Sequence, residues 1–337
     1  MKTLNLCFLG FGNVGEALAH LLLRKREEMR EQYGIEWIVT GIATRRRGWL
    51  VDPEGFRLSA FFGCEAGPEV APRPGNVRDW LKAARADVLF ETTSLNPQTG
   101  QPAIDYIRAG LEHGAHVITA NKGPIVHGYQ ELSALARKLG RRFMFESTVA
   151  DCLPVFSLFR EALPLAGLRG FKGIFNSTTG VVIEEMEAGR TFEEGIERAQ
   201  LLGIAETDPS YDVDGWDATV KVCALANVLM NVPLKTEEVQ REGIRDLTPA
   251  MLRAAREAGR AFKLVSRATL TDEGRMIATV RPEQVSPPDA LANASGTSLL
   301  VHFELDVLPG LTLIAHEPDL RSTAYGLLAD FINAVRD

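Results

Sequence analysis

The N-terminal residues of this chain place an apolar run, a glycine-rich turn and a long helical segment in direct succession. Residues 4–9 form the apolar run, residues 10–15 read Gly-Phe-Gly-Asn-Val-Gly, and a helix is predicted from about Glu16 to Gln32. A strand that turns sharply into a helix at a parallel sheet edge needs glycines in this pattern. The order is typical of a doubly wound α/β domain with a dinucleotide site.

Each glycine of this turn has its own role in such a site. The first permits the tight turn, the second lets a pyrophosphate approach the backbone, and the third allows helix and strand to pack closely. The helix N-terminus then faces the phosphates. A purely structural glycine turn is the alternative, which the flanking strand and helix disfavour. The cofactor-binding residues predicted from this turn are Gly10, Gly12, Asn13, Val14 and Gly15.

An arginine run follows the second predicted strand, residues 35–43. Arg45, Arg46 and Arg47 stand where an NAD-binding domain usually places an acidic residue for the ribose hydroxyl. Arginines there can hold a ribose 2′-phosphate through paired hydrogen bonds. We therefore expect Arg45 and Arg46 to favour NADP over NAD, and solvated loop charges are the competing interpretation.

Strands and helices continue to alternate up to about residue 149. A strand at 87–91 ends in Thr92, Thr93 and Ser94, whose hydroxyls are expected to face the cofactor at the carboxyl edge of the sheet. The other elements expected here are helices at 77–85, 102–113 and 129–139 and strands at 116–119 and 142–146. An irregular segment is expected at 52–74, and the strand at 116–119 is expected to end in a loop that carries Lys122. The pattern predicts a parallel sheet.

Acidic residues are densest immediately before Lys221. Five of them fall within residues 206–217, and Asp214 is placed to cap a helix that carries Asp217 and Lys221 one turn apart on one face. A solvated surface pair is the alternative. Few charges follow between 222 and 232, which favours a pocket.

This stretch resembles the signature of the homoserine dehydrogenase family. The match runs without a gap through Ala199, Gly203, Asp208, Pro209, Asp212, Val213, Gly215, Asp217 and Lys221. Val220 departs from the many relatives that carry arginine there. The resemblance covers essentially the whole chain and includes residues 119–124, Thr-Ala-Asn-Lys-Gly-Pro, in which relatives place the lysine in the active site.

The resemblance implies NAD(P)-dependent interconversion of L-homoserine and L-aspartate 4-semialdehyde, within threonine, methionine and isoleucine biosynthesis. Reduction of a carbonyl creates negative charge on oxygen, which a nearby ammonium can stabilise and protonate. Lys221 is the expected proton donor, and Lys122 is its expected electrostatic partner beside the cofactor. Carboxylates near the lysine suit a substrate that carries an ammonium. The expected substrate-binding residues are Glu206, Asp217, Asp212, Gly203 and Thr178.

Two other function classes stay open at this point. One is a dehydrogenase of the same architecture that acts on another small amino or hydroxy aldehyde. The other is a non-catalytic NADP-binding sensor, which has no need for both lysines.

Two domains are expected. Residues 1–149 form a Rossmann domain that the resemblance completes with a C-terminal helix at 320–337, and residues 150–319 form a substrate-binding and dimerisation domain. Alternating apolar patterns at 262–270, 276–280, 299–305 and 311–315 predict a mostly antiparallel open sheet in the second domain. Residues 176–180, Asn-Ser-Thr-Thr-Gly, are expected to form a polar turn. The resemblance further implies a homodimer.

A sodium ion is a further expectation from relatives, in which a glycine-rich loop between the domains binds it through backbone carbonyls. Here residues 150–152, Ala-Asp-Cys, replace those glycines. The corresponding backbone ligands are Glu146, Val149 and Asp151.

Composition excludes several classes of partner. With 37 basic and 44 acidic residues the net charge is −7, which provides no global field for nucleic acid or anionic lipid. No apolar run reaches membrane-spanning length. The four cysteines lie far apart without a metal-binding spacing, which indicates a reduced, cytoplasmic protein. The chain ends at Asp337, too early for the regulatory domain that some relatives append.

Overall fold

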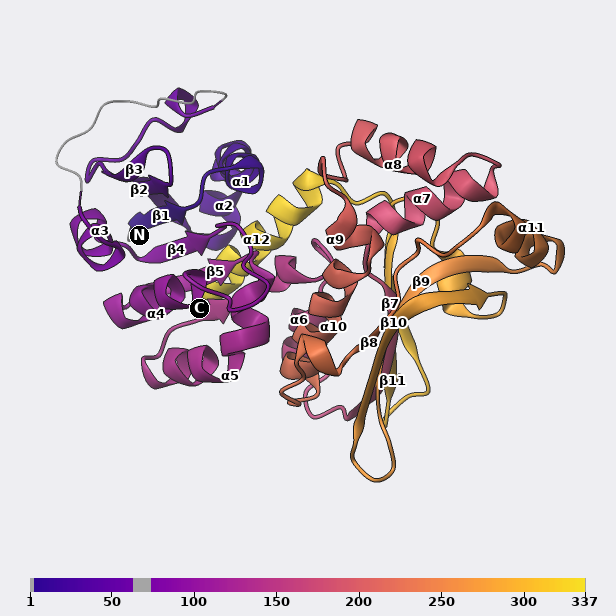
Figure 1. Cartoon of the computed structure of the whole chain (residues 1–337). Coiled ribbons are helices and arrows are strands. Elements are labelled where there is room, and N and C mark those ends of the chain that lie inside the picture. The colour runs from indigo at the N-terminus through magenta and orange to yellow at the C-terminus, as the bar shows by residue number, and fades with distance from the viewer. Residues whose placement is uncertain (1–2, 63–73, 337) are drawn as a thin grey trace. The chain divides into compact units, whose positions relative to one another are not determined.

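The computed structural model describes residues 3–62 and 74–336 (Figure 1). The chain folds into two compact units, Met1–Pro154 with Asp319–Asp337, and Val155–Pro318. Cys64 and much of the irregular segment expected before residue 74 lie outside the described residues.

A six-stranded sheet in the order β3-β2-β1-β4-β5-β6 forms the centre of the first unit. Its strands are β1 (Thr3–Leu9), β2 (Glu36–Thr44), β3 (Gly48–Val51), β4 (Val88–Glu91), β5 (His116–Thr119) and β6 (Phe143–Met144). All pairings are parallel except the β2–β3 hairpin. This confirms the predicted doubly wound sheet. The short β3 was not predicted.

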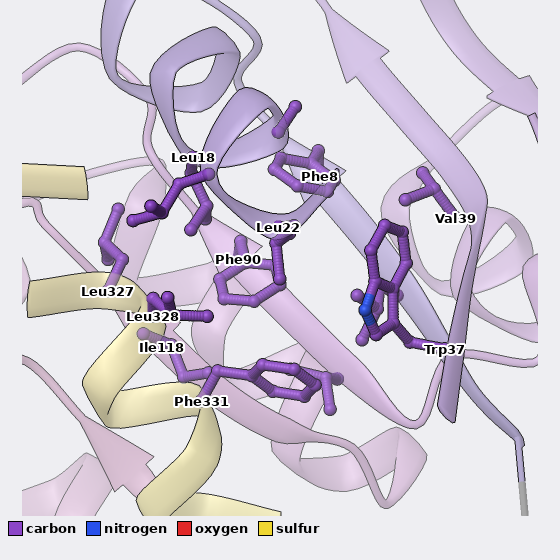
Figure 2. Packing of buried hydrophobic residues seen from close by; sticks show 14 of the residues in the cluster. Phe8, Leu18, Leu22, Trp37, Val39, Phe90, Ile118, Leu327, Leu328 and Phe331 are labelled. Atoms are coloured by element: carbon purple, nitrogen blue, oxygen red, sulfur yellow. The ribbon is translucent and has the colours of Figure 1, made fainter. Parts of the chain in front are cut away.

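Helices cover both faces of this sheet. They are α1 (Asn13–Arg24), α2 (Arg26–Tyr33), α3 (Val77–Ala84), α4 (Ala103–His113), α5 (Lys122–Lys138) and α12 (Leu320–Val335). Figure 2 shows Phe8 and Phe90 of the sheet packed with Leu22 of α1 and Phe331 of α12. Burial of each such side chain stabilises the fold by about 1.5–3 kcal/mol. This gain holds α12, the last helix of the chain, in the core of the first unit.

Two helix boundaries in this unit differ from the prediction. The helix expected from Glu16 to Gln32 is two helices, because the backbone leaves helical geometry at Lys25. The helix expected from Tyr129 begins at Lys122, where Asn121 caps it by accepting a hydrogen bond from the Gly123 amide. The Gly-Pro pair suggested a loop, but proline is tolerated in a first helical turn, where amides have no partner within the helix.

The second unit also holds a six-stranded sheet, in the order β12-β11-β7-β9-β10-β8. Its strands are β7 (Leu168–Ile174), β8 (Gln240–Arg241), β9 (Ala261–Leu270), β10 (Met276–Val285), β11 (Leu299–Leu305) and β12 (Leu311–Ala315). Every pairing is antiparallel except β10 with β8. This confirms the predicted mostly antiparallel sheet, and Figure 1 shows the long β9–β10 hairpin in orange.

Helices α7 (Ser177–Glu187), α10 (Trp216–Leu229) and α11 (Pro249–Glu257) pack against β9, and α8 (Phe192–Leu201) packs on α7. Helix α11 and strand β8 were not predicted. The prediction of a polar turn at 176–180 was wrong, because α7 begins at Ser177. Asn176 caps the helix by accepting from the Thr179 amide, a role for which asparagine is strongly preferred.

Candidate active site

A cavity of about 950 Å³ lies at the carboxyl edge of β1, β2 and β4 in the first unit. This volume is typical of sites that bury a cofactor-sized ligand. Eight residues predicted to bind the cofactor line it, namely Gly10, Gly12, Asn13, Arg45, Arg46, Thr92, Thr93 and Ser94. Val14, Gly15 and Lys122 are not among its lining residues.

The three glycines of the turn meet different constraints. Gly10 has φ +93°, and a Cβ there would lie 2.5 Å from the Thr92 carbonyl oxygen. A Cβ on Gly15 would approach the Gly10 carbonyl oxygen at 3.0 Å, whereas a Cβ on Gly12 would meet no heavy atom within 4 Å. Gly10 and Gly15 therefore serve close packing, and the space at Gly12 is open for a ligand to approach the backbone.

The arginines divide into two kinds. Arg45 and Arg46 are exposed, and Arg45 donates to Ser94 Oγ at 3.0 Å. The Arg47 guanidinium lies 5.2 Å from the centre of the Phe61 ring and donates to the Phe61 carbonyl oxygen. Arg47 also lines the cavity but packs against Phe61, whereas Arg45 and Arg46 are exposed beside the cavity.

Sequence reasoning missed the far part of the cavity lining. Trp49 of the β2–β3 hairpin, and Gln101, Pro102 and Tyr106 around the start of α4, line it. The rings of Trp49 and Tyr106 meet edge to face with centroids 6.1 Å apart. No sequence pattern links these residues, because only folding of the sheet brings the β3 hairpin beside α4.

Lys122 is the first residue of α5 rather than part of a loop. Asn121, the residue before it, accepts a hydrogen bond from the amide of Gly123, the residue after it, so the Lys122 backbone is held at the start of the helix.

A second cluster lies in the other unit, where β7 ends and α7 begins. Lys221 Nζ lies 2.8 Å from Asp217 Oδ2, and it also donates to the Phe175 carbonyl oxygen. Asn176 Nδ2 donates to Asp217 Oδ2 at 3.0 Å. The Lys221 and Asp217 side chains are only 13% and 9% exposed, so the alternative of a solvated surface pair is wrong.

Asp212, on the short helix α9 (Ser210–Val213), extends this cluster. Its two oxygens accept from Asn176 Nδ2 at 2.7 Å and from Thr178 Oγ1 at 2.9 Å. Burial, followed by the neighbouring Asp217 charge, raises the pKa of Asp212. Asn176 therefore links two carboxylates, a role that sequence reasoning missed.

The remaining predicted substrate residues sit on an exposed segment. Gly203, with φ +73°, follows the end of α8, and Glu206 is exposed. The prediction that Asp214 caps α10 was wrong: Gly215 is the N-cap, with no side-chain hydrogen bond. Arg245 instead binds the Asp214 carboxylate, a contact that local sequence cannot reveal.

The loop expected to bind sodium is hydrogen-bonded to α12. The Glu146 amide donates to Asp330 Oδ2 at 2.7 Å, and Thr323 donates to Asp151 Oδ1 at 2.7 Å. Among the described residues, no three His, Cys, Asp or Glu side chains are grouped to hold a metal. Backbone ligation by Glu146, Val149 and Asp151 stays a prediction.

Comparison with known proteins identifies the family. Residues 154–332 match the homoserine dehydrogenase model, and residues 10–146 match the homoserine dehydrogenase NAD-binding domain model. The chain belongs to the homoserine dehydrogenase family. It is an NAD(P)-dependent oxidoreductase that acts on a CH–OH group, and the family places it in threonine and methionine biosynthesis.

Relatives match along nearly the full length. An NAD(+)-dependent homoserine dehydrogenase of Pseudomonas canavaninivorans is 34% identical over 99% of this chain and 96% of its own. The homoserine dehydrogenase of Methanocaldococcus jannaschii is 31% identical over 98% of both. The crystal structure of a putative homoserine dehydrogenase from Archaeoglobus fulgidus superimposes with a TM-score of 0.85 at 31% identity, covering 99% of this chain and all of that one. In the described part of this homoserine dehydrogenase family member, none of the helices has the length and apolarity to cross a membrane.

Proposed function

We propose that this protein interconverts L-homoserine and L-aspartate 4-semialdehyde, with Lys221 as the proton donor in the reducing direction. The observation that carries the proposal is the buried cluster in which Asp217, Asn176 and the Phe175 carbonyl oxygen surround Lys221. The bound nicotinamide cofactor supplies the hydride. The residues of the chain then bind the substrate, orient it and protonate the oxygen.

Lys221 has the chemistry required for this step. Its Nζ is held at 2.8 Å from the Asp217 carboxylate, and this contact fixes the direction of the amine. An ammonium held in a largely buried site stabilises negative charge on the substrate oxygen more strongly than one in water. Lys122, at the first residue of α5, supplies a second positive charge in this scheme. The proximity of the two lysines stays a prediction.

The acidic groups provide the complementary half of the site. We assign Glu206 and Asp217 to the substrate ammonium, since the Glu206 carboxylate has no partner among the described residues. Asp212 accepts from both Asn176 and Thr178 and so holds Asn176 in place, and Gly203 supplies the backbone turn before Glu206. The assignment explains why carboxylates gather near a catalytic lysine.

For the cofactor we propose a preference for NADP over NAD. The exposed guanidinium groups of Arg45 and Arg46 beside the cavity support it, because they suit a 2′-phosphate. The Pseudomonas canavaninivorans relative is named as NAD(+)-dependent, so the preference needs direct measurement. We further propose that the protein is a cytoplasmic homodimer. Its 146–151 loop is proposed to bind sodium.

The deciding experiment measures initial rates of NADPH and NADH oxidation with L-aspartate 4-semialdehyde, for the parent and for Lys221→Ala. We expect turnover in the parent and a loss of at least about 100-fold in the variant, with cofactor binding retained. Lys235→Ala, a lysine ahead of a short exposed turn, is the control and should keep the parent rate.

Two results would contradict the proposal. A folded parent that binds cofactor but reduces only other aldehydes would favour a related dehydrogenase. A parent that turns over no aldehyde would favour an NADP-binding sensor.

A further inference from the structure

Glu91, the last residue of β4, is a carboxylate with no exposure to solvent. Its Oε1 accepts from the Thr93 amide at 2.9 Å and from the Thr93 hydroxyl at 2.5 Å, and its Oε2 accepts from the Thr119 hydroxyl at 2.7 Å. Both oxygens therefore accept hydrogen bonds. A glutamate side chain is rarely buried completely unless its polar atoms are paired in this way. Leu89 and Phe90 of the same strand are apolar and equally buried, so packing at this place does not require a carboxyl group.

The bonds continue from Glu91 to the start of α5. Thr119 Oγ1 donates to Glu91 and at the same time accepts from the Asn121 amide at 2.9 Å. Asn121 Oδ1 then accepts from the Gly123 amide at 3.0 Å. Lys122 is the residue between Asn121 and Gly123, so its backbone is held on both sides.

A second branch reaches the cofactor cavity. Thr93, which binds Glu91 twice, lines the cavity, and its carbonyl oxygen accepts from Asn121 Nδ2 at 3.3 Å. Glu91 thus joins the segment after β4 to the segment after β5. Within the described residues, the hydrogen bonds of the Glu91 carboxyl group go to these two strand ends, where ligands bind in a sheet of this kind.

We propose that Glu91 is a positioning residue that acts through Thr119 and Asn121 to hold Lys122 in register with the cofactor segment at Thr93. The inference rests on the proposed role of Lys122 in the reaction. Displacement of a reacting group by about 1 Å can cost about 100-fold in rate, so a buried network of this kind has a kinetic effect without touching substrate. Glu91 itself is too deeply buried to contact either reactant.

The test removes the relay hydroxyl in Thr119→Val and measures kcat with L-aspartate 4-semialdehyde together with the NADPH dissociation constant. We expect kcat to fall about 10- to 100-fold while the dissociation constant changes less than about twofold. Thr119→Ser keeps the hydroxyl and should restore most of the rate. Thr40→Val is the matched control, because Thr40 is another buried threonine of this sheet and donates to the Ala84 carbonyl oxygen outside the network.

A double-mutant cycle separates positioning from general damage. In a Lys122→Ala background, assayed at high enzyme concentration, Thr119→Val should lower kcat by less than about threefold, because the group that it positions is gone. If Thr119→Val is unfolded by circular dichroism, Glu91→Gln replaces it in the same cycle with the same expectation.

Additive effects on kcat, or a loss in Thr40→Val as large as in Thr119→Val, would overturn the inference while leaving the proposed function intact. Absence of turnover in the parent would instead refute the proposed function.

Discussion

Asp217 and Lys221 form an ion pair across one turn of α10, with 2.8 Å between Oδ2 and Nζ and side chains only 9% and 13% exposed. An exposed pair at this spacing stabilises a helix by only about 0.2–0.5 kcal/mol. Burial changes the balance, because a buried charge that loses its partner is left uncompensated. The pair is therefore a point where stability and the proposed chemistry depend on the same atoms.

Asp217→Asn should damage both properties. We expect a loss of about 3 kcal/mol in the free energy of unfolding in urea, because Lys221 keeps its charge without its partner. The rate of aldehyde reduction should fall by at least about 10-fold. Arg275→Gln breaks a pair in which both side chains are more than 70% exposed, and it should cost less than about 1 kcal/mol. Equal losses in the two variants would contradict the prediction.

Asp212 predicts a pH dependence of stability. Its pKa is raised in the folded state, so the folded protein keeps this proton where the unfolded chain has lost it. The free energy of unfolding therefore falls as pH rises from near the unfolded pKa through the folded one. In Asp212→Asn this loss disappears, and the stability of the variant relative to the parent should increase as the pH rises from about 4 through the raised folded-state pKa. Urea unfolding of both proteins across this range measures it, and a difference that does not change with pH would refute it.

Arg45→Ala should discriminate between the two cofactors. A charge-assisted hydrogen bond to a 2′-phosphate is worth about 1.5–3 kcal/mol, which corresponds to about 10- to 100-fold in the NADPH dissociation constant. The NADH constant should change less than about twofold, since that cofactor lacks the phosphate. Fluorescence titration measures both constants. Arg137→Ala, exposed in the last turn of α5, is the charge-matched control. Equal weakening for both cofactors would argue against a 2′-phosphate contact.

Gly10→Ala and Gly12→Ala should separate folding from cofactor binding. At Gly10, φ is +93° and the new Cβ would lie 2.5 Å from the Thr92 carbonyl oxygen, so we expect a loss of at least about 2 kcal/mol in stability. At Gly12 the Cβ has no neighbour within 4 Å, so stability should change by less than about 1 kcal/mol. The Gly12 methyl group should nevertheless weaken NADPH binding by at least about 10-fold, because it fills the space that a pyrophosphate would use. Thermal unfolding and titration distinguish the two effects, and parent-like NADPH binding by Gly12→Ala would contradict this position for the pyrophosphate.

Local patterns predicted the main architecture but misplaced several boundaries. The α5 and α7 helices both start directly after an asparagine cap, at Asn121 and Asn176. Glycine, proline and hydroxyl residues after each cap suggested loops, although the cap signal was present in the sequence. The opposite error occurred at Asp214, which was predicted to cap a helix. Its side chain instead binds Arg245, 31 positions later in the chain.

Burial explains most of what the sequence could not indicate. The choice between a solvated and a buried Asp217–Lys221 pair depends on the two residues between β7 and α7. These are Phe175 and Asn176, which lie 46 and 41 positions before their partners. The network around Glu91 likewise needs β4 and β5 side by side, which brings Thr119 to its carboxylate.

The sequence by itself determined the features that arise from short-range chemistry. The glycines at 10–15 and the spacing of Asp217 and Lys221 impose their geometry on any backbone of this type, because φ angles and helical periodicity are local. Only the tertiary structure decided which donors bind each buried carboxylate. It also decided that Arg47 packs against Phe61 and that Trp49 and Tyr106 line the same cavity. These outcomes depend on contacts between segments far apart in the chain, whose energies arise only when packing removes water from both partners.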